Sequence, residues 1–555
     1  MKKVKHTVKL LGALVSSVVI LSACGNAEGI YDDKGQVFRK VITQDMSSLD
    51  TAKVTDNVSF DKFNQVYEGL YTAGKSDKVE PGVATGEPEV TNGGKTWTIH
   101  LRKNAKWSNG DPVTAHDFEF AWKRVLDPNT AAEYAYIMYD LKNAEAVNMG
   151  KKDVNTLGVK ALDDYTLRFE LTKPIPYYKE MLAFGTFLPQ NEKIVKKYGE
   201  RYGTSEDKSV YNGPFKVKDW AVEDKIILVK NNEYWDKQAV KLDKVNYKVL
   251  KDSQAGASLY DTESVDDTTI TSEQVEKYKD DVALKKRIMP ATFYLKLNQG
   301  QVPELKNQHM RLALAQAINK EDYVNSVLNN GSAVTDGFTA KGTADAPNGK
   351  DFTSQIKSPL KYDVKKAKEN YEKAKKELGK DKFTMTLNTD DTPSSKISAE
   401  FIKSQIETTL PGITIKIKQF PFKQRIAREQ SENYEISLSG WAPDYPDPMT
   451  FLKIMTTGNT SNNTGWGNKK YDELLKKANG ELLQNAEARN QTLIEAEELL
   501  LNEAPVAPIY QKGEAHLTNP QVKGLHYHNM GGDTSLKYTY IDKSIDRKTG
   551  KKKTK

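Results

Sequence analysis

Segments with the two-residue period of a strand alternate with segments that have the 3.6-residue period of a helix along the whole chain. The run "TWTIHLR" at 96–102 places its apolar residues on one strand face, and residues 413–420 alternate in the same way. Between them, residues 364–378 carry an apolar stripe at helical spacing, after Asp363 as a cap and before Gly379 as a stop. No internal repeat relates these segments. Interleaved strands and helices predict an α/β class with mixed sheets.

The first 24 residues have the features of an export signal. Four lysines precede an apolar run at 10–23, which is too short for an ordinary transmembrane helix. The run ends in "LSAC", and Cys24 is the only cysteine in the chain. This pattern is similar to a bacterial lipoprotein signal, which implies cleavage after Ala23 and acylation of the Cys24 thiol; a plain secretory signal with an incidental cysteine is the alternative. A lipid on Cys24 would hold the protein on a membrane without a spanning helix.

The positive net charge lies at the two ends of the chain. Of a formal excess of +7, residues 1–23 contribute four lysines and residues 547–555 six basic side chains, so the body between them is slightly acidic. We therefore predict no nucleic-acid partner. The basic end at 547–555 is predicted to be a disordered tail, with attraction to anionic lipid or wall polymer as an alternative.

Catalytic and metal-binding motifs are missing from the sequence. It contains no GxSxG, Walker, GxGxxG or HExxH motif, and no nucleophile with a neighbouring base. His526 and His528 form a lone HxH without a nearby cysteine, which favours strand or loop positions over a metal pair. We predict a protein that is not an enzyme and that has no cofactor and no metal site.

A proline-rich loop, "GWAPDYPDP" at 440–448, sets an acid and an indole in a stiff backbone. Proline fixes φ and restricts the residue before it, so this segment is predicted to be a rigid, irregular loop. Such a loop serves either as a turn after a strand or as a holder for a ligand.

Five blocks occur together and in order: "GKTWTIHLRKNAKWSNGDPVTAHDFEFAWKRVLDP", "LGVKALDDYTLRFELTKPIPYY", "NGPFKVKDW", "NNEYWDK" and "WAPDYPDP". With them the chain resembles the lipid-anchored solute-binding proteins of peptide ABC transporters, in particular the OppA-like oligopeptide-binding members. The resemblance implies a type II periplasmic-binding-protein-like fold of three domains (cluster C), with two lobes, a hinge and an extra subdomain. The implied division is a signal peptide at 1–23, a spacer at 24–34, lobe I at 35–67, 200–288 and 518–546, the subdomain at 68–199, and lobe II at 290–517.

The resemblance also implies the ligand contacts. Asp444 stands at the position whose carboxylate neutralises a peptide's α-ammonium group. Gly440 and Ala442 match main-chain positions that hydrogen-bond an extended peptide, and Trp441 matches an aromatic that lines a side-chain pocket. Asn57 matches a lobe I position that grips the peptide backbone from the opposite side.

The implied function is capture of extracellular oligopeptides for import. The protein would be a monomer, lipid-anchored at the outer face of the cytoplasmic membrane of a Gram-positive bacterium, with an ABC permease as its partner. Leu438 stands where members restricted to short peptides have arginine, although Arg425 and Arg428 are nearby, which implies loose recognition of the peptide's far end. The alternatives are a receptor for one signalling peptide such as a conjugation pheromone, a carrier of haem or nickel complexes, and a surface hydrolase.

Overall fold

A large mixed sheet organises the computed structural model, which describes residues 35–75 and 78–554 and confirms the α/β class. Strand order along this eleven-stranded sheet is β15-β14-β16-β12-β17-β11-β1-β10-β9-β8, with β13 paired to β17 at the side. β1 is parallel to β10, whereas β12 is antiparallel to β16 and to β17. The strands are β1 Val37–Ile42, β8 Phe215–Ala221, β9 Lys225–Lys230, β10 Lys244–Val249, β11 Asp267–Ile270, β12 Leu284–Leu297, β13 Ala333–Val334, β14 Phe383–Asp390, β15 Ile413–Phe420, β16 Ile436–Trp441 and β17 Val506–Thr518.

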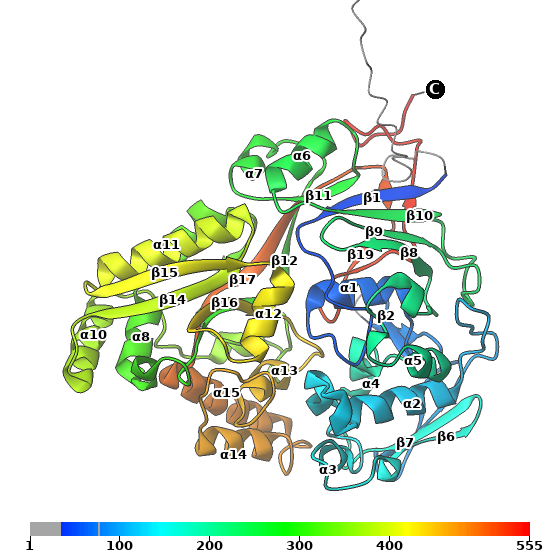
Figure 1. Ribbon diagram of the computed structural model, residues 1–555, viewed down its shortest axis with the longest axis horizontal. Coiled ribbons are helices and arrows are strands. Elements are labelled where there is room, and N and C mark those ends of the chain that lie inside the picture. Colours follow the sequence, from blue (N-terminus) through cyan, green and yellow to red (C-terminus); the bar gives the residue numbers. More distant parts are fainter. Residues whose placement is uncertain (1–34, 76–77, 555) are drawn as a thin grey trace, which may run out of the picture.

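Two halves of the molecule share this sheet (Figure 1). One half contains β1 and β8–β11 with α1, and the other contains β14–β16 with the helices that pack on and around them. Asp56 caps helix α1 by accepting a hydrogen bond from the Ser59 amide at 2.8 Å, and the helix buries Phe60 and Phe63. The helices of the other half are α8 Gln308–Gln316, α10 Val364–Leu378, α11 Pro393–Thr409, α12 Phe422–Gln430, α13 Met449–Leu452, α14 Lys469–Ala478 and α15 Ala486–Glu503, and α1 is Asn57–Val66.

The predicted helix at 364–378 forms as expected. Asp363 caps it by accepting from the Lys366 amide at 3.0 Å, and Gly379 ends it in the left-handed region with φ 62°. Its buried residues Ala367, Tyr371 and Ala374 lie on the expected stripe. The local sequence signals therefore suffice for this helix.

Two long antiparallel strands, β12 and β17, connect the halves. β17 pairs with β11 at Thr518 and with β12 as far as Val506, while β12 continues to pair with β16. The register between β12 and β17 shifts between Ile288 and Thr292, so three residues of β12 face one residue of β17. Such a bulge bends a strand and interrupts its ladder. The connection is therefore irregular at the point where it passes from one half to the other.

A separate four-stranded sheet, in the order β4-β5-β7-β6, packs with α2 at the bottom of Figure 1. A capping box begins α2, since the Asp117 carboxylate accepts from the Thr114 amide at 2.8 Å, and the helix ends before Asp127 and Pro128. The elements are β4 Glu89–Thr91, β5 Thr96–His100, β6 Val159–Asp163, β7 Thr166–Glu170 and α2 Ala115–Leu126.

Shorter elements complete the described chain. They are β2 Tyr71–Ala73, β3 Val79–Pro81, α3 Ala144–Asn148, α4 Tyr178–Met181, α5 Glu192–Tyr198, α6 Ser253–Asp261, α7 Glu273–Lys277, α9 Lys320–Asp322, β18 Val522–Lys523, β19 His526–Tyr527, β20 Thr534–Ser535 and β21 Tyr540–Ile541. One large apolar core runs through both halves and the four-stranded sheet, and a second, smaller core fills the space around α6, α7 and β11. None of the helices within 35–75 and 78–554 has the length and apolar character that a membrane span requires.

The basic end of the chain is not the disordered tail that its composition predicts. Residues 547–554 form a turn, in which the Asp546 amide donates to the Lys551 carbonyl at 2.7 Å. Arg547 holds this turn to the body: its guanidinium pairs with Asp266 at 3.2 Å and donates to the Val265 carbonyl at 2.6 Å. The charge of residues 547–555 does not predict this turn, because the turn depends on an ion pair with the buried Asp266 elsewhere in the chain. The expected signal peptide and spacer, with Cys24, lie outside the described residues.

Candidate functional site

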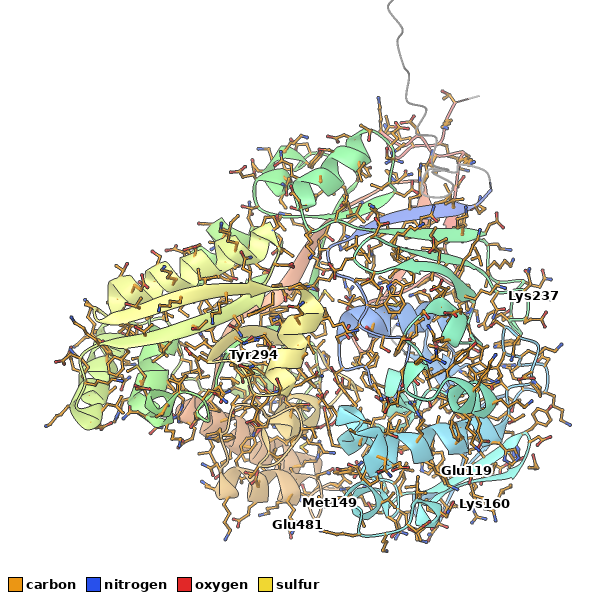
Figure 2. The ribbon with its side chains drawn as sticks, in the orientation of Figure 1. Glu119, Met149, Lys160, Lys237, Tyr294 and Glu481 are labelled. Atoms are coloured by element: carbon orange, nitrogen blue, oxygen red, sulfur yellow. The ribbon has the colours of Figure 1, made fainter. Side chains whose placement is uncertain are left out.

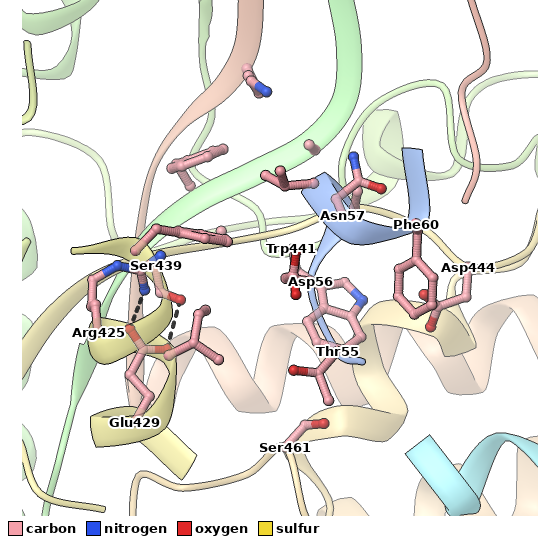
Figure 3. Close-up of a pocket in the computed structure, with 18 of the residues that line it drawn as sticks. Thr55, Asp56, Asn57, Phe60, Arg425, Glu429, Ser439, Trp441, Asp444 and Ser461 are labelled. Carbon is pink, nitrogen blue, oxygen red and sulfur yellow. Dashed lines mark hydrogen bonds and ion pairs between the residues drawn. The ribbon is translucent and has the colours of Figure 1, made fainter. Parts of the chain in front are cut away.

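A cavity of about 220 Å³ lies between the two halves of the molecule. The structure brings all five predicted ligand contacts to its wall: Asn57, Gly440, Trp441, Ala442 and Asp444. Figure 3 shows Asn57 on α1, Trp441 at the end of β16 and Asp444 on the loop that follows. Residues that are about 380 positions apart in the chain therefore face the same space. Their roles toward a ligand stay predictions.

The Asp444 carboxylate is buried at one end of this wall. Its side chain accepts from the Tyr134 hydroxyl at 3.2 Å and from the Thr450 hydroxyl at 3.4 Å, and its own amide donates to the Thr450 oxygen at 2.8 Å. It makes no ion pair with any residue in the described part of the chain, and only 7% of the residue is exposed. Burial raises the pKa of Asp444 to about 8, although the two hydroxyls lower it in part. A cation brought here would therefore meet a carboxyl group that has no other cationic partner and that must lose its proton to pair with the cation.

The loop that carries Asp444 is fixed from both sides. Arg489 on α15 makes a bidentate ion pair with Asp447, with N–O distances of 2.7 and 2.8 Å. The Gly531 amide donates to the Pro443 carbonyl at 3.3 Å from the opposite half. With three prolines in the loop, its backbone has little freedom left. The loop is irregular, as expected from the sequence, and these contacts limit its movement.

An aromatic stack flanks the carboxylate. The Trp441 ring lies parallel to the Tyr134 ring, with centroids 6.0 Å apart and an interplanar angle of 7°. The Trp441 indole also donates to the Thr450 carbonyl at 3.0 Å. Tyr134, on the 3₁₀ helix η2 (Glu133–Met138), thus touches both Asp444 and Trp441. This role of Tyr134 is not evident from the sequence, because its partners lie more than 300 residues away.

Strand β16 presents an open edge to the site. On one side it pairs with β12 from Ile436 to Trp441, but on the other side β14 pairs only with its first two residues, Ile436 and Ser437. A Cβ at Gly440 would lie 2.8 Å from ring carbons of Phe293, which itself stacks on Tyr510, so the close approach of these strands requires glycine here. Beyond the first two residues, the main chain of β16 is left without a ladder partner on its β14 side.

Asn57 lies on the facing wall, as the first residue of α1. Its amide donates to the Asp533 carboxylate at 2.6 Å. Asp533 also lines the cavity. The Asn57 amide is therefore held in place by a partner from its own half of the molecule.

The other end of the wall carries an ionic cluster. Arg425 and Glu429 on α12 pair with each other, and Arg425 also pairs with Asp390 at 2.6 Å. Glu429 further accepts from the Ser439 hydroxyl at 3.0 Å (Figure 3) and pairs with Lys296 at 3.3 Å. Burial alone would raise the pKa of Glu429, but Arg425 and Lys296 outweigh it and lower the pKa to about 2. Two cations and two acids offset one another here, which the sequence alone did not indicate.

Direct contacts close the cavity between the halves. The Gln44 amide donates to Asp390 at 2.9 Å, and the Gln430 amide donates to the Thr55 hydroxyl at 3.1 Å. Farther out, Lys251 bridges Asp391 at 2.8 Å. The structure thus has its two halves drawn together around the cavity. No histidine or cysteine occurs among the described residues that line it.

Comparisons with known proteins agree on the kind of molecule. Residues 78–463 match the family model of bacterial extracellular solute-binding proteins, family 5 (middle). The chain is 35% identical to the dipeptide-binding protein of Lactococcus lactis, over 96% of this chain and 99% of that protein. It superposes on Listeria monocytogenes OppA bound to peptide with a TM-score of 0.89 and 38% identity, over 92% of this chain and 100% of that one. The pheromone receptor PrgZ gives a TM-score of 0.88 and 35% identity at the same two coverages.

Proposed function

The chain belongs to the bacterial extracellular solute-binding proteins of family 5, and we propose that it binds oligopeptides between its two lobes and delivers them to an ABC permease. One observation carries this proposal: the open edge of β16 leads directly to a buried, unneutralised Asp444. An extended peptide can add to a free strand edge through its main chain, whatever its side chains are. Its α-ammonium group, which every unmodified peptide has, then meets Asp444.

The other predicted contacts fit the same ligand position. Gly440 and Ala442 offer main-chain groups at the strand edge, and Trp441 offers a flat apolar wall for a side chain. Asn57 would hold the peptide backbone from the facing lobe. An ion pair at 4 Å is worth about 4 kcal/mol at an effective dielectric near 20, before desolvation is subtracted. Because the loop is already fixed, little conformational entropy is lost when the peptide binds.

We also propose the division of the chain into lobes and subdomain that the resemblance implies. In this division the register shift between Ile288 and Thr292 lies at the boundary between lobe I and lobe II. The four-stranded sheet and α2 belong to the subdomain at 68–199. A bend at the shift would allow the lobes to open for a peptide and close over it.

The membrane anchor is part of the same proposal. Acylation of Cys24 would hold the receptor, as a monomer, at the outer face of the cytoplasmic membrane beside its permease. The protein would bind its peptide without cleaving it. Metabolic labelling with palmitate tests the anchor: we expect label in the unaltered protein and none in Cys24→Ala.

Calorimetry with two forms of one tripeptide tests the proposed binding site. We expect the free-amine form to bind and the N-acetylated form to bind at least about tenfold more weakly, because the acetyl group removes the cation that faces Asp444. Equal affinity for the two forms would overturn the assignment of Asp444. Recovery of the peptide uncut after incubation would support binding without hydrolysis.

A signalling peptide is the second candidate ligand. The similarity of the chain to PrgZ, a pheromone receptor, supports this candidate. Competition between a defined pheromone and a mixed pool of tripeptides separates the two functions. A nutrient receptor would bind the pool as tightly as the pheromone. A dedicated receptor would keep the pheromone in the presence of a large excess of the pool.

A further inference from the structure

Acidic side chains outnumber basic ones on the cavity wall. The wall has six acids, Asp56, Glu133, Asp390, Glu429, Asp444 and Asp533, and three bases, Lys296, Arg425 and Lys512. Each base already has an acidic partner: Arg425 and Lys296 pair within the ionic cluster, and Lys512 pairs with Glu514 at 2.6 Å. The wall therefore has a surplus of acid that its own cations do not neutralise.

Two of the remaining acids are occupied by structural hydrogen bonds. Asp56 caps α1 and accepts from the hydroxyls of Ser47 and Ser59. Asp533 accepts from the Asn57 amide. Once Asp444 is assigned to the ammonium group, Glu133 is the acid left over.

Glu133 is held at a defined place on the wall. Its carbonyl accepts from the Thr460 hydroxyl of the other lobe at 2.6 Å, which fixes its backbone across the cleft. The residue after it is Tyr134, which touches Asp444 and stacks on Trp441. The Glu133 side chain is half-buried and makes no ion pair with any residue in 35–75 or 78–554. Burial raises its pKa, although the Gln430 amide and the charge of Lys296 lower it in part.

We infer that Glu133 binds the cationic side chain of a lysine or arginine in the ligand, one or two residues after the ammonium group, so that peptides with a basic residue at this position are the favoured substrates. This inference rests on the proposed peptide-binding function. Residues of an extended chain are about 3.3 Å apart, so a residue next to the one held at Asp444 comes to lie beside the Tyr134 and Trp441 rings. A long basic side chain can lay its apolar stem along these rings and present its charge to Glu133.

Four tripeptides test the subsite by calorimetry: Ala-Lys-Ala, Ala-norleucine-Ala, Ala-Ala-Lys and Ala-Ala-norleucine. Norleucine keeps the apolar stem of lysine and lacks its charge. We expect the unaltered protein to prefer one of the lysine peptides at least about tenfold over its norleucine partner. Glu133→Gln should reduce this preference to about twofold or less, while the affinity for the norleucine peptides stays the same. Glu133→Lys should reverse the charge preference, so that a fifth peptide, Ala-Glu-Ala, binds more tightly than Ala-Lys-Ala.

Glu145→Gln is the matched control, because Glu145 is an exposed acid on α3 outside the cavity wall. It should keep the full lysine preference. Equal binding of lysine and norleucine peptides by the unaltered protein, or a lysine preference that survives Glu133→Gln, would overturn the subsite alone. If the unaltered protein bound none of the four peptides, the proposed function would fall and the subsite with it.

Discussion

The two ends of the cavity handle buried charge in opposite ways. At one end Asp444 is an acid without a cationic partner, stabilised only by the hydroxyls of Tyr134 and Thr450. At the other end Arg425, Lys296, Asp390 and Glu429 neutralise one another. An isolated buried charge is costly, whereas a fully paired cluster needs nothing from a ligand. We propose from this difference that a ligand's charge is needed at the Asp444 end and is optional at the other.

The same contrast suits a receptor for varied peptides. The ammonium group is constant among unmodified peptides, so a fixed acid can recognise it. Peptides of different lengths place their C-terminal carboxylates at different positions. Because the ionic cluster is already neutral, it does not favour one of these positions over another. Arg425, which the sequence analysis noted as a nearby cation, is occupied by two acids of its own.

Removal of the isolated acid should have the largest effect. Asp444→Asn should weaken binding of a free-amine tripeptide by at least about 30-fold, since loss of one partner of a buried charge pair costs about 2 to 5 kcal/mol. Calorimetry measures this change, and the N-acetylated peptide is the control, whose affinity should hardly move. Without ligand the variant should unfold at a higher temperature at pH 7, because Asp444 has its pKa raised in the folded state and therefore destabilises it above its unfolded pKa near 3.8. A lower melting temperature would contradict the burial of an unpaired carboxyl.

Removal of one acid from the paired cluster should instead lower stability. Glu429→Gln leaves Arg425 and Lys296 undercompensated, and breaking a buried pair costs about 3 to 5 kcal/mol. The pKa of Glu429 is lowered from 4.5 to about 2, so its stabilising contribution is present above pH 4.5 and disappears as the pH falls toward 2. Thermal unfolding should show a clear difference between variant and unaltered protein at pH 7 and almost none near pH 2. A constant difference over this range would show that the carboxylate charge is not what stabilises the cluster.

The pH dependence of peptide binding between pH 5 and 8 should report on Asp444 and not on Glu429, whose pKa is about 2. With a pKa of about 8, Asp444 must lose a proton before it can pair with an ammonium group, whose own pKa is about 7.7 to 8.0. Affinity should rise about tenfold per pH unit from pH 6 toward 7.5 and fall above pH 8. Calorimetry in buffers of different ionisation enthalpy should detect close to one proton released at pH 6.5. A flat profile of affinity from pH 5 to 7 would contradict this prediction. It would show that water hydrates Asp444 before the peptide binds, so that the carboxyl group is already ionised.

The exposed ion pair between the lobes should have the smallest effect. Lys251 bridges Glu223 and Asp391 at 2.9 and 2.8 Å across the lobes, and its side chain is one-third exposed. Exposed ion pairs contribute about 0.2 to 1 kcal/mol, so Lys251→Gln should weaken peptide binding about fivefold or less, through faster release. Lys225→Gln is the matched control, because Lys225 pairs with Asp219 at 2.6 Å within one lobe. An equal effect of both variants would show that Lys251 does not help to hold the lobes together.

Local sequence patterns predicted those parts of the fold that depend on neighbouring residues. The helix at 364–378 and the rigid loop at 440–448 are set by caps, glycine and proline, and both form as expected. The turn at 547–554 depends instead on Asp266, and composition therefore predicted it wrongly. Hydrogen bonds between distant segments leave no periodic trace in a sequence.

The candidate site shows the same limit. The loop after β16 could be singled out from its prolines, and the resemblance to a family added Asn57 on the facing wall. Tyr134 and Glu133 could not be found, because only folding brings η2 beside a loop that is about 310 residues away. The ionic cluster likewise joins two strands and a helix, and its members look like ordinary surface charges in the sequence.

Gln36, just before β1, and Ile541, at the end of β21, exchange two hydrogen bonds of 2.7 and 3.1 Å. The first and last parts of the described fold are thus neighbours, on the side of the molecule away from the cavity (Figures 1 and 2). A circular permutant could join residue 546 to residue 35 by a short flexible linker and open the chain in the exposed turn at 347–350. Such a molecule would carry its new ends on lobe II, where an attached fluorophore could report each closing of the lobes.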